Sequence, residues 1–469
     1  MAEMLIDLVK GDKIGDETDY RDNLPVNMSG VNRPMFGAAG YMLQEPGLTQ
    51  YTSGEGVDRG GIWNERFSEH YRVSGTSLIH VNNDGVVTSL GSVPGTDTTS
   101  LPYSFNTQGI VASGRFYLYD SANGFREVTD PDLGNPIDGV WVDGYYFFTD
   151  GEFIYHTELN DEEAIDPLQL ATSEFSPDPT LGVGRTTDNK VAVFNRYSTE
   201  FFVNVAQANF AFQRVTTRAA KVGIVGTHCK CEILDRWFLM GGRKEEDVSV
   251  HVLSVGSATK IGSREVDKII NTYSESELSE SVLEARGEND YNYLIVHLPN
   301  HTLKYNLQLA QKVGSEKAWT ILKTDVNGDA TWRAKHGVWE SSRNQWVYGD
   351  KRDNTIGYLD DTVTTHYGAL VEWILYTPFM YLEKGSVDYL EIETMPGHNS
   401  EDDATVFVSL TYDGVTDGFE WTAQYGRPGD YQKRFIVNRL GYVRDWFGFK
   451  LRAASTSRMG FSRAFIGYA

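Results

Sequence analysis

The alternation of apolar and turn-forming residues is most regular between residues 140 and 158. Three short runs rich in aromatic and β-branched residues are separated by the pairs Asp143-Gly144 and Asp150-Gly151. Asp-Gly accepts the positive φ angles of a type I′ turn, whose twist matches that of the strands it joins. The stretch therefore predicts an antiparallel meander of three strands. Such a ribbon cannot bury both of its faces alone, so it needs neighbours of the same kind.

Similar strand-turn-strand units recur on both sides of this meander. The seven candidate units cover residues 60–87, 109–124, 140–158, 190–203, 236–253, 291–322 and 337–359. Six or seven meanders of about forty residues each are typical of a β-propeller, in which radial repetition leaves only short edges exposed. We therefore expect an all-β chain with a propeller of six or seven blades over residues 58–365. The blade core should contain the aromatic residues Tyr103, Phe105, Tyr117 and Tyr145 to Phe148.

The two ends of the chain depart from this repeat. Residues 1–57 carry prolines at positions 25, 34 and 46, which predict an extended segment lying on other structure. Residues 366–469 contain longer strands, and the stretch 405–412 alternates strictly between polar and apolar positions. The longer strands and their alternation predict a C-terminal β-sandwich-like domain. We expect the N-terminal segment to pack on that domain, since the propeller units lie between them in the chain.

One stretch, residues 272–286, predicts a short helix. Ser274 and Glu277 have the spacing of a capping box, Leu278 and Val282 lie four apart, and Arg286 suits the C-terminal end of the helix dipole. Packing against a blade edge is the more common role for such a helix, and an interface between proteins is the alternative.

The charge balance excludes several classes of partner. The chain has 469 residues and a net charge of −23, from 65 acidic and 42 basic residues. Such a surface does not condense on nucleic acid or on an anionic membrane. Cys229 and Cys231 are too close together to brace a fold, which indicates a reduced intracellular protein. The first residues do not resemble a signal peptide and no apolar run approaches the ~20 residues of a membrane span, so we expect a soluble product of the cytoplasm.

Several short motifs, in the same order along the chain, resemble the packaged-DNA stabilisation proteins. These are the tail hub or nozzle proteins of lambdoid short-tailed phages, the podoviruses. The matching stretches are Leu24-Pro25-Val26-Asn27-Met28, Gly40-Tyr41, Pro46-Gly47-Leu48, residues 223–230, residues 294–299 with His301, Gly349-Asp350-Lys351, residues 375–378 and residues 448–452. Each motif is weak alone, whereas the ordered set is specific. The third and fourth meanders match little beyond the strand pattern.

The resemblance implies a structural protein of the virion tail without enzymatic activity. It implies a homo-hexamer, assembled in the host bacterial cytoplasm, that attaches below the portal–adaptor rings. There it closes the channel to retain packaged DNA and later forms part of the ejection conduit, carrying the tail needle and contacting the tailspikes or tail fibres. DNA would pass without sequence-specific binding. A ring of acidic chains would repel the phosphates along its bore, although an acidic exterior would explain the charge equally well.

Propellers also host enzymes and lectins, so a second class of function stays open. Residues Thr411-Tyr412-Asp413-Gly414 resemble the Asp-box turn of sialidase blades, but they lie outside the predicted propeller. A sialidase also needs an arginine cluster and an acid pair near a tyrosine, which the sequence does not place. The alternative is a carbohydrate-binding or glycan-hydrolysing propeller, sialidase-like or an adhesin, at a phage tail tip.

Three other patterns resemble metal sites only in part. The oxygens of Asp325, Asn327 and Asp329 have calcium-loop spacing, but Ala330 and His336 stand where that loop needs glycine and glutamate. The run His228-Cys229-Lys230-Cys231 lacks the remaining ligands of a zinc site. His297 and His301 lie four apart across a strand, turn and strand, and so would not share a face. We therefore predict no catalytic, cofactor-binding or metal-ligating residues and no cofactor.

Overall fold

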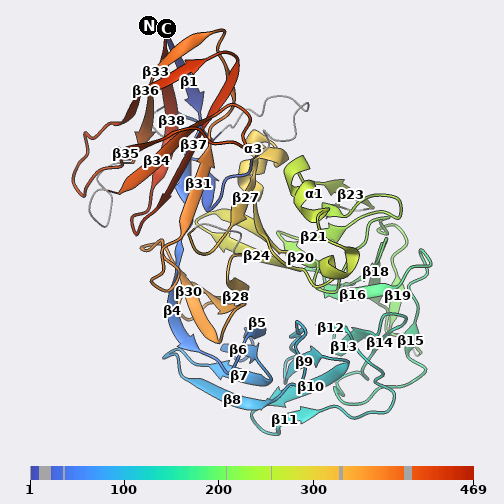
Figure 1. The fold of residues 1–469 in the computed structure, drawn as a ribbon. Helices are drawn as coiled ribbons and strands as arrows, with labels where there is room; N and C mark the ends of the chain where they lie inside the picture. The colour runs from blue at the N-terminus through green and yellow to red at the C-terminus, as the bar shows by residue number, and fades with distance from the viewer. Residues whose placement is uncertain are drawn as a thin grey trace.

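The computed structural model describes residues 2–9, 23–34, 37–207, 209–254, 256–326, 331–395 and 404–469. Within these ranges seven sheets form a ring, and two further sheets pack face to face beside it (Figure 1). The all-β prediction with a propeller and a sandwich is confirmed, and the number of blades is seven.

The seven blades follow one another along the chain. The first holds β5 (Asp58–Asn64), β6 (Glu69–Ser74), β7 (Ser77–Val81) and β8 (Val87–Ser92). The second and third hold β9 (Gln108–Ala112), β10 (Arg115–Asp120) and β11 (Gly124–Glu127), then β12 (Asp138–Val142), β13 (Tyr145–Thr149), β14 (Ile154–His156) and β15 (Leu170–Ala171). The fourth and fifth hold β16 (Thr180–Arg185), β17 (Val191–Asn195), β18 (Thr199–Asn204) and β19 (Phe212–Arg214), then β20 (Lys230–Ile233), β21 (Arg236–Gly241), β22 (Ser249–Ser254) and β23 (Ser257–Lys260). The sixth and seventh hold β24 (Val282–Glu288), β25 (Tyr291–His297), β26 (Thr302–Asn306) and β27 (Trp319–Leu322), then β28 (Ala334–Glu340), β29 (Gln345–Asp350), β30 (Thr355–Asp360) and β4 (Gly47–Ser53).

The meander between residues 140 and 158 forms the third blade. Val142 pairs with Tyr145, and the two residues between them have φ angles of 53° and 92°, so the predicted type I′ turn at Asp143-Gly144 is confirmed. The second predicted tight turn is wrong, because Thr149 pairs with Ile154 and leaves four residues between the strands. The carboxylate of Asp150 closes this wider turn by accepting hydrogen bonds from the two amides that follow Gly151.

The ring is closed by a strand from the N-terminal region. β4 pairs antiparallel with β30, so the seventh blade is built from two distant parts of the chain. Figure 1 shows this blue strand beside the orange one. We expected residues 1–57 to lie together on the C-terminal domain, and for Gly47–Ser53 that expectation is wrong. The reason is that β30 would otherwise be a bare sheet edge, which β4 covers.

The remaining strands form the β-sandwich. One sheet holds β1 (Ala2–Asp7), β2 (Met28–Val31), β3 (Tyr41–Gln44), β33 (Gly385–Thr394), β36 (Phe435–Val443) and β38 (Gly460–Tyr468). The other holds β31 (Glu372–Tyr376), β32 (Met380–Tyr381), β34 (Thr405–Thr411), β35 (Glu420–Gln424) and β37 (Trp446–Ala454). Trp373 of β31 packs on Phe461 of β38 with ring centroids 5.3 Å apart, which joins the two sheets. Both chain ends meet where β1 pairs with β38.

The predicted helix over residues 272–286 is wrong in its second half. Ser274 and Glu277 form the expected capping box, but helix α2 (Glu275–Leu278) ends after one turn. The residues from Val282 onward form β24, which pairs along its whole length with β25. Pairing with a largely buried partner strand therefore outweighs the local helical spacing. The described chain also contains α1 (Arg264–Ile270), α3 (Leu307–Val313) and a 3₁₀ turn, η2 (Ser315–Lys317), which the sequence analysis did not predict.

Most predicted core aromatics are buried, with one clear exception. Tyr117 and the run Tyr145 to Phe148 are buried, whereas Phe105 is 63% exposed and its ring stands on edge against Trp141. Phe105 lies in a turn between two strands, so its side chain points out of the blade. The largest apolar cluster runs without a break from blades four to six into the sandwich. No helix in the described ranges is long and apolar enough to cross a bilayer.

Candidate functional site

The first strand of each blade lines a central cavity of about 620 Å³. In the second blade, residues 100–103 take this place, since Ser100 and Tyr103 bridge to β9. Residues of all seven blades therefore border the cavity. Glycine is needed at one close approach, because a Cβ on Gly61 would lie 2.7 Å from the guanidinium carbon of Arg72.

Asp138 of β12 joins four blades at this centre. Its carboxylate accepts hydrogen bonds from the Ser100 hydroxyl at 2.5 Å and from the Val183 amide at 2.8 Å. It also pairs with the ammonium of Lys230 at 2.7 Å. Ser100, Val183 and Lys230 come from blades two, four and five. One buried carboxylate thus connects blades two to five of the ring.

A second buried group joins the first and last blades. Asp58 of β5 pairs with Arg72 at 2.8 Å and accepts a hydrogen bond from Nδ1 of His336 at 2.6 Å. Burial raises the pKa of Asp58, but Arg72 and His336 outweigh it and hold that pKa below its ordinary value. Burial also lowers the pKa of His336. The imidazole is therefore neutral at neutral pH, with Nε2 free to accept a hydrogen bond.

Glu284 of β24 connects the sixth and seventh blades in the same way. Its carboxylate accepts hydrogen bonds from the amides of His336 and Gly337, the latter at 3.1 Å, and lies 3.2 Å from Nε2 of His297. Burial raises the pKa of Glu284, but His297 and the other donors hold it well below its usual range. Burial lowers the pKa of His297 to about 4. These groups serve as fixed hydrogen-bonding connections between blades.

The residues that the sequence offered as a zinc site do not converge on one point, because His228 and Cys229 bind different main-chain groups. Nε2 of His228 lies 3.2 Å from the carbonyl oxygen of Thr98, and the thiol of Cys229 donates to Leu278 and Ser281 oxygens. Burial raises the pKa of Cys229 to about 12 and also raises that of Cys231. Among the described residues, no group of three His, Cys, Asp or Glu side chains could hold a metal ion.

The other candidates are likewise apart from one another. His297 contacts Glu284, whereas His301 contacts the Tyr273 hydroxyl. Residues 327–330 of the calcium-like loop lie outside the described residues, and Asp325 pairs with Arg352 at 2.9 Å. That the chain has no catalytic, cofactor-binding or metal-ligating residues stays a prediction.

The Asp-box-like stretch forms a turn after β34 in the sandwich. The Asp413 carboxylate accepts hydrogen bonds from the amides of Val415 and Thr416 at 2.9 and 2.7 Å. These amide bonds lower the pKa of Asp413 to about 2. The aspartate is thus occupied in closing its own turn.

The junction of the two domains is the second candidate site. Val26 bridges to Ile321 of the sixth blade and to Ile374 of the sandwich. The adjacent Asn27 donates from its side chain to Lys323 and Glu372 oxygens at 3.1 and 2.7 Å. A segment of the Leu-Pro-Val-Asn-Met motif therefore lies between the domains and binds both.

Glu45 forms a buried charge cluster beside this segment. Its carboxylate pairs with Lys304 at 2.6 Å and with Arg286 at 3.2 Å. Burial raises the pKa of Glu45, but these two cations outweigh it and lower the pKa to about 2. The sequence analysis missed Glu45, Asp138 and Glu284. A usable signal was present for Asp138, which is the single charged residue at the start of the apolar strand Asp138–Val142.

Comparisons with known proteins cover nearly the whole chain. A family described as bacteriophage P22 Gp10, beta-propeller, matches residues 4–364, and one described as bacteriophage P22 Gp10, beta-sandwich, matches residues 372–468. The tail hub protein gp10 of Salmonella phage P22 is 29% identical over 467 residues, covering 94% of this chain and 93% of that protein.

Solved structures match about two thirds of the chain at low sequence identity. A streptogramin B lyase has a TM-score of 0.43 and 12% identity, covering 68% of this chain and 97% of its own. The Pan2 WD40 domain of Neurospora crassa has a TM-score of 0.41 and 7% identity, covering 69% and 98%. These likenesses are too weak to support a shared function.

Proposed function

The chain belongs to the bacteriophage P22 Gp10 family, and from this premise we propose that it is the structural tail hub of a short-tailed phage. The observation that carries the proposal is the coverage, since the matches span both the propeller and the sandwich and the P22 tail hub protein aligns along 94% of the chain. We infer that the propeller with β4 and the sandwich with β1 to β3 act as two units joined at the Val26–Asn27 segment.

We propose that the chain works in the virion as a homo-hexamer. The ring would attach below the portal–adaptor rings, close the channel over packaged DNA, and carry the tail needle and tailspikes or fibres. Assembly would take place in the host bacterial cytoplasm. Side chains from neighbouring blades meet at the centre of the ring, as Asp138 does with Ser100 and Lys230, which supports a multimer in which DNA passes between copies.

The net charge of the chain is also consistent with a conduit for DNA between copies. A net charge of −23 on each chain disfavours lasting contacts with phosphates, which would slow ejection. Buried pairs such as Asp58–Arg72 and Asp138–Lys230 would keep each propeller rigid while DNA moves past it.

Negative-stain electron microscopy of the purified full chain mixed with portal–adaptor rings tests this proposal. We expect a six-fold ring that caps the adaptor end, together with retention of DNA in filled heads that carry it. A chain that remains monomeric, ignores the rings and binds glycans would overturn the hub function in favour of an adhesin. Asn27→Ala should weaken capping by loosening the two units, whereas Asn160→Ala, at an exposed turn, serves as the matched control.

A further inference from the structure

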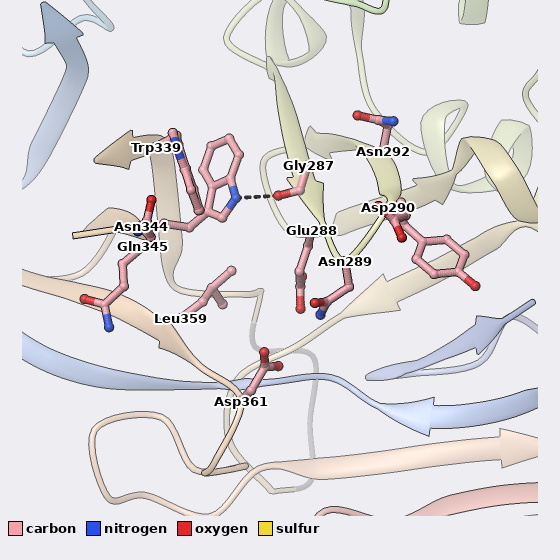
Figure 2. A pocket seen from close by; sticks show the side chains of 12 residues that line it. Gly287, Glu288, Asn289, Asp290, Asn292, Trp339, Asn344, Gln345, Leu359 and Asp361 are labelled. Carbon is pink, nitrogen blue, oxygen red and sulfur yellow. Dashed lines mark hydrogen bonds between the residues drawn. The ribbon is translucent and has the colours of Figure 1, made fainter. Parts of the chain in front are cut away.

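A second cavity, of about 450 Å³, lies at the edge between the sixth and seventh blades. Figure 2 shows it from close by, with Glu288 and Asn289 on one side, Trp339 and Leu359 on the other, and Asp361 below them. Trp339 and Trp346 also line the central cavity, whereas the buried carboxylates Asp138 and Glu284 do not line this second one. We propose that this cavity binds a neutral saccharide.

Two tryptophan rings, tilted by 56° to each other, give the cavity an apolar wall. The rings of Trp339 and Trp346 lie 5.7 Å apart between centroids, and Trp339 is 41% exposed. The indole N–H of Trp346 donates to the Gly287 carbonyl at 2.6 Å, which ties the wall to the neighbouring blade (Figure 2). The ring of Trp346 is therefore held in place before any ligand arrives, which lowers the entropy lost on binding. The C–H face of a pyranose ring suits such an indole surface.

Polar groups around this wall match the hydroxyls of a sugar. Asn289 and Asp290, with φ angles of 48° and 68°, form a tight turn between β24 and β25 that places them at the rim. Amides donate and accept hydrogen bonds, and carboxylates accept them, so vicinal hydroxyls can be bound in pairs. Gln345 also lines the cavity, and its Oε1 is buried without a hydrogen-bond partner in the described part of the chain.

The charges at the cavity favour a neutral ligand over a cation. Glu288 already has Arg286 at 3.5 Å, and Asp361 already has Arg458 at 2.9 Å. A lysine or arginine side chain from a partner would compete with these arginines for the same carboxylates. Acidic sugars are disfavoured in turn, because the carboxylate of Asp290 at the rim would repel them. Neutral or N-acetylated hexoses remain as the ligand class.

Binding of defined sugars to the full chain tests the proposal. The probes are immobilised glucose, galactose, mannose, rhamnose, N-acetylglucosamine and glucuronic acid, followed by calorimetric titration of those that bind. We expect at least one neutral sugar to bind and Trp339→Ala to weaken it by about tenfold or more, while Trp339→Phe retains part of the affinity. Tyr431→Ala, an aromatic 66% exposed on the sandwich, should change nothing.

Three results would overturn the proposal. They are the absence of saturable binding for every neutral sugar, binding unaffected by Trp339→Ala in a variant with a native circular dichroism spectrum, and glucuronic acid binding as tightly as the neutral sugars. Displacement of the sugar by hexa-arginine would leave the site in place, whereas hexa-arginine binding alone would assign the cavity to a cationic partner instead. The Trp339→Ala variant should still cap portal–adaptor rings. Loss of sugar binding can then be distinguished from loss of the hub function.

Discussion

The side-chain amide of Asn27 donates to the carbonyl oxygen of Glu372 at 2.7 Å and so ties the N-terminal segment to the sandwich. The same side chain donates to the Lys323 carbonyl and accepts from the Lys323 amide at 2.9 Å, next to the sixth blade. Asn27 has a φ angle of 51°, in the left-handed region that asparagine tolerates better than most residues. One asparagine therefore satisfies the main chain of both domains at their junction.

Asn27→Ala should destabilise the protein by about 2–4 kcal/mol, because it leaves buried main-chain groups without partners. Differential scanning calorimetry should show a lower melting temperature, with the propeller and sandwich transitions drawn apart. Asn160→Ala is the control, since Asn160 has a similar φ angle of 58° but lies exposed in a turn. Equal effects of the two variants would show that backbone strain alone, and no interdomain contact, matters at Asn27.

Gly47 begins the strand that closes the propeller, and its position leaves no room for a side chain. A Cβ there would lie 2.4 Å from the Thr365 oxygen and 2.9 Å from the Thr365 nitrogen, both in the main chain. Gly47→Ala should therefore push the start of β4 away from the Thr365 main chain, disturb its pairing with the adjoining end of β30, and cost about 1–3 kcal/mol or more. Hydrogen exchange measured by mass spectrometry should show faster exchange in Thr355–Asp360.

The control for Gly47 is a strand glycine with space around it. The atoms nearest to a Cβ on Gly448 would be Phe379 ring atoms at 3.5–3.6 Å, an ordinary van der Waals distance, so Gly448→Ala should be tolerated. If Gly47→Ala left exchange in β30 unchanged, the pairing of β4 with β30 would not be what closes the ring.

Local patterns were enough to predict the blades, because each turn and its strands lie within a few residues. Asp143-Gly144 forms the expected turn between Val142 and Tyr145. The same local logic failed for residues 282–286, where the helical spacing is real but pairing with Tyr291–His297 decides the structure. Secondary structure there is set by a neighbour, which a local pattern does not contain.

Contacts between distant parts of the chain could not be predicted. The pairing of β4 with β30 joins residues about three hundred positions apart, and no local signal fixes that register. Asp138 was likewise missed as a site residue, since its partners Ser100, Val183 and Lys230 meet only when four blades are in place. The ordered family motifs identified the protein class, and the junction around Asn27 explains in physical terms why one of those motifs matters.

His297 should make the protein less stable as the pH is lowered through a defined interval. Burial lowers its pKa to about 4 from an ordinary value of 6.5, so between these values the unfolded chain binds a proton that the folded chain does not. Stability therefore decreases as pH falls from about 6.5 to about 4, by about 3 kcal/mol from this residue. Urea unfolding of the parent chain and of His297→Asn at several pH values should show a shallower decrease for the variant.

Two observations check this assignment. His80→Asn replaces a half-buried histidine of the first blade and should leave the pH dependence nearer to that of the parent chain. The imidazole of His297 followed by NMR should stay neutral to about pH 4. Protonation of His297 near pH 6.5, or parallel pH profiles for the parent chain and His297→Asn, would contradict the prediction.

Glu45 should contribute stability that is lost only in strong acid. The carboxylate is the counter-charge of two buried cations, and the ammonium of Lys304 also lies 3.8 Å from the centre of the Tyr293 ring. Burial lowers the pKa of Lys304 to about 8, so it is still charged at pH 7. Glu45→Gln removes the counter-charge and should cost about 3–5 kcal/mol at that pH, measured by urea unfolding.

The pH dependence and a second substitution make this prediction specific. Because the folded pKa of Glu45 is about 2, below its ordinary 4.5, its contribution is complete above pH 4.5 and declines as pH falls towards 2. The difference between the parent chain and Glu45→Gln should therefore shrink across that interval. Adding Lys304→Met to Glu45→Gln should recover part of the loss, because it removes one unpaired buried charge. Glu152→Gln, at an exposed turn, is the control, and a cost equal to that of Glu45→Gln would show that the buried cluster does not hold the junction together.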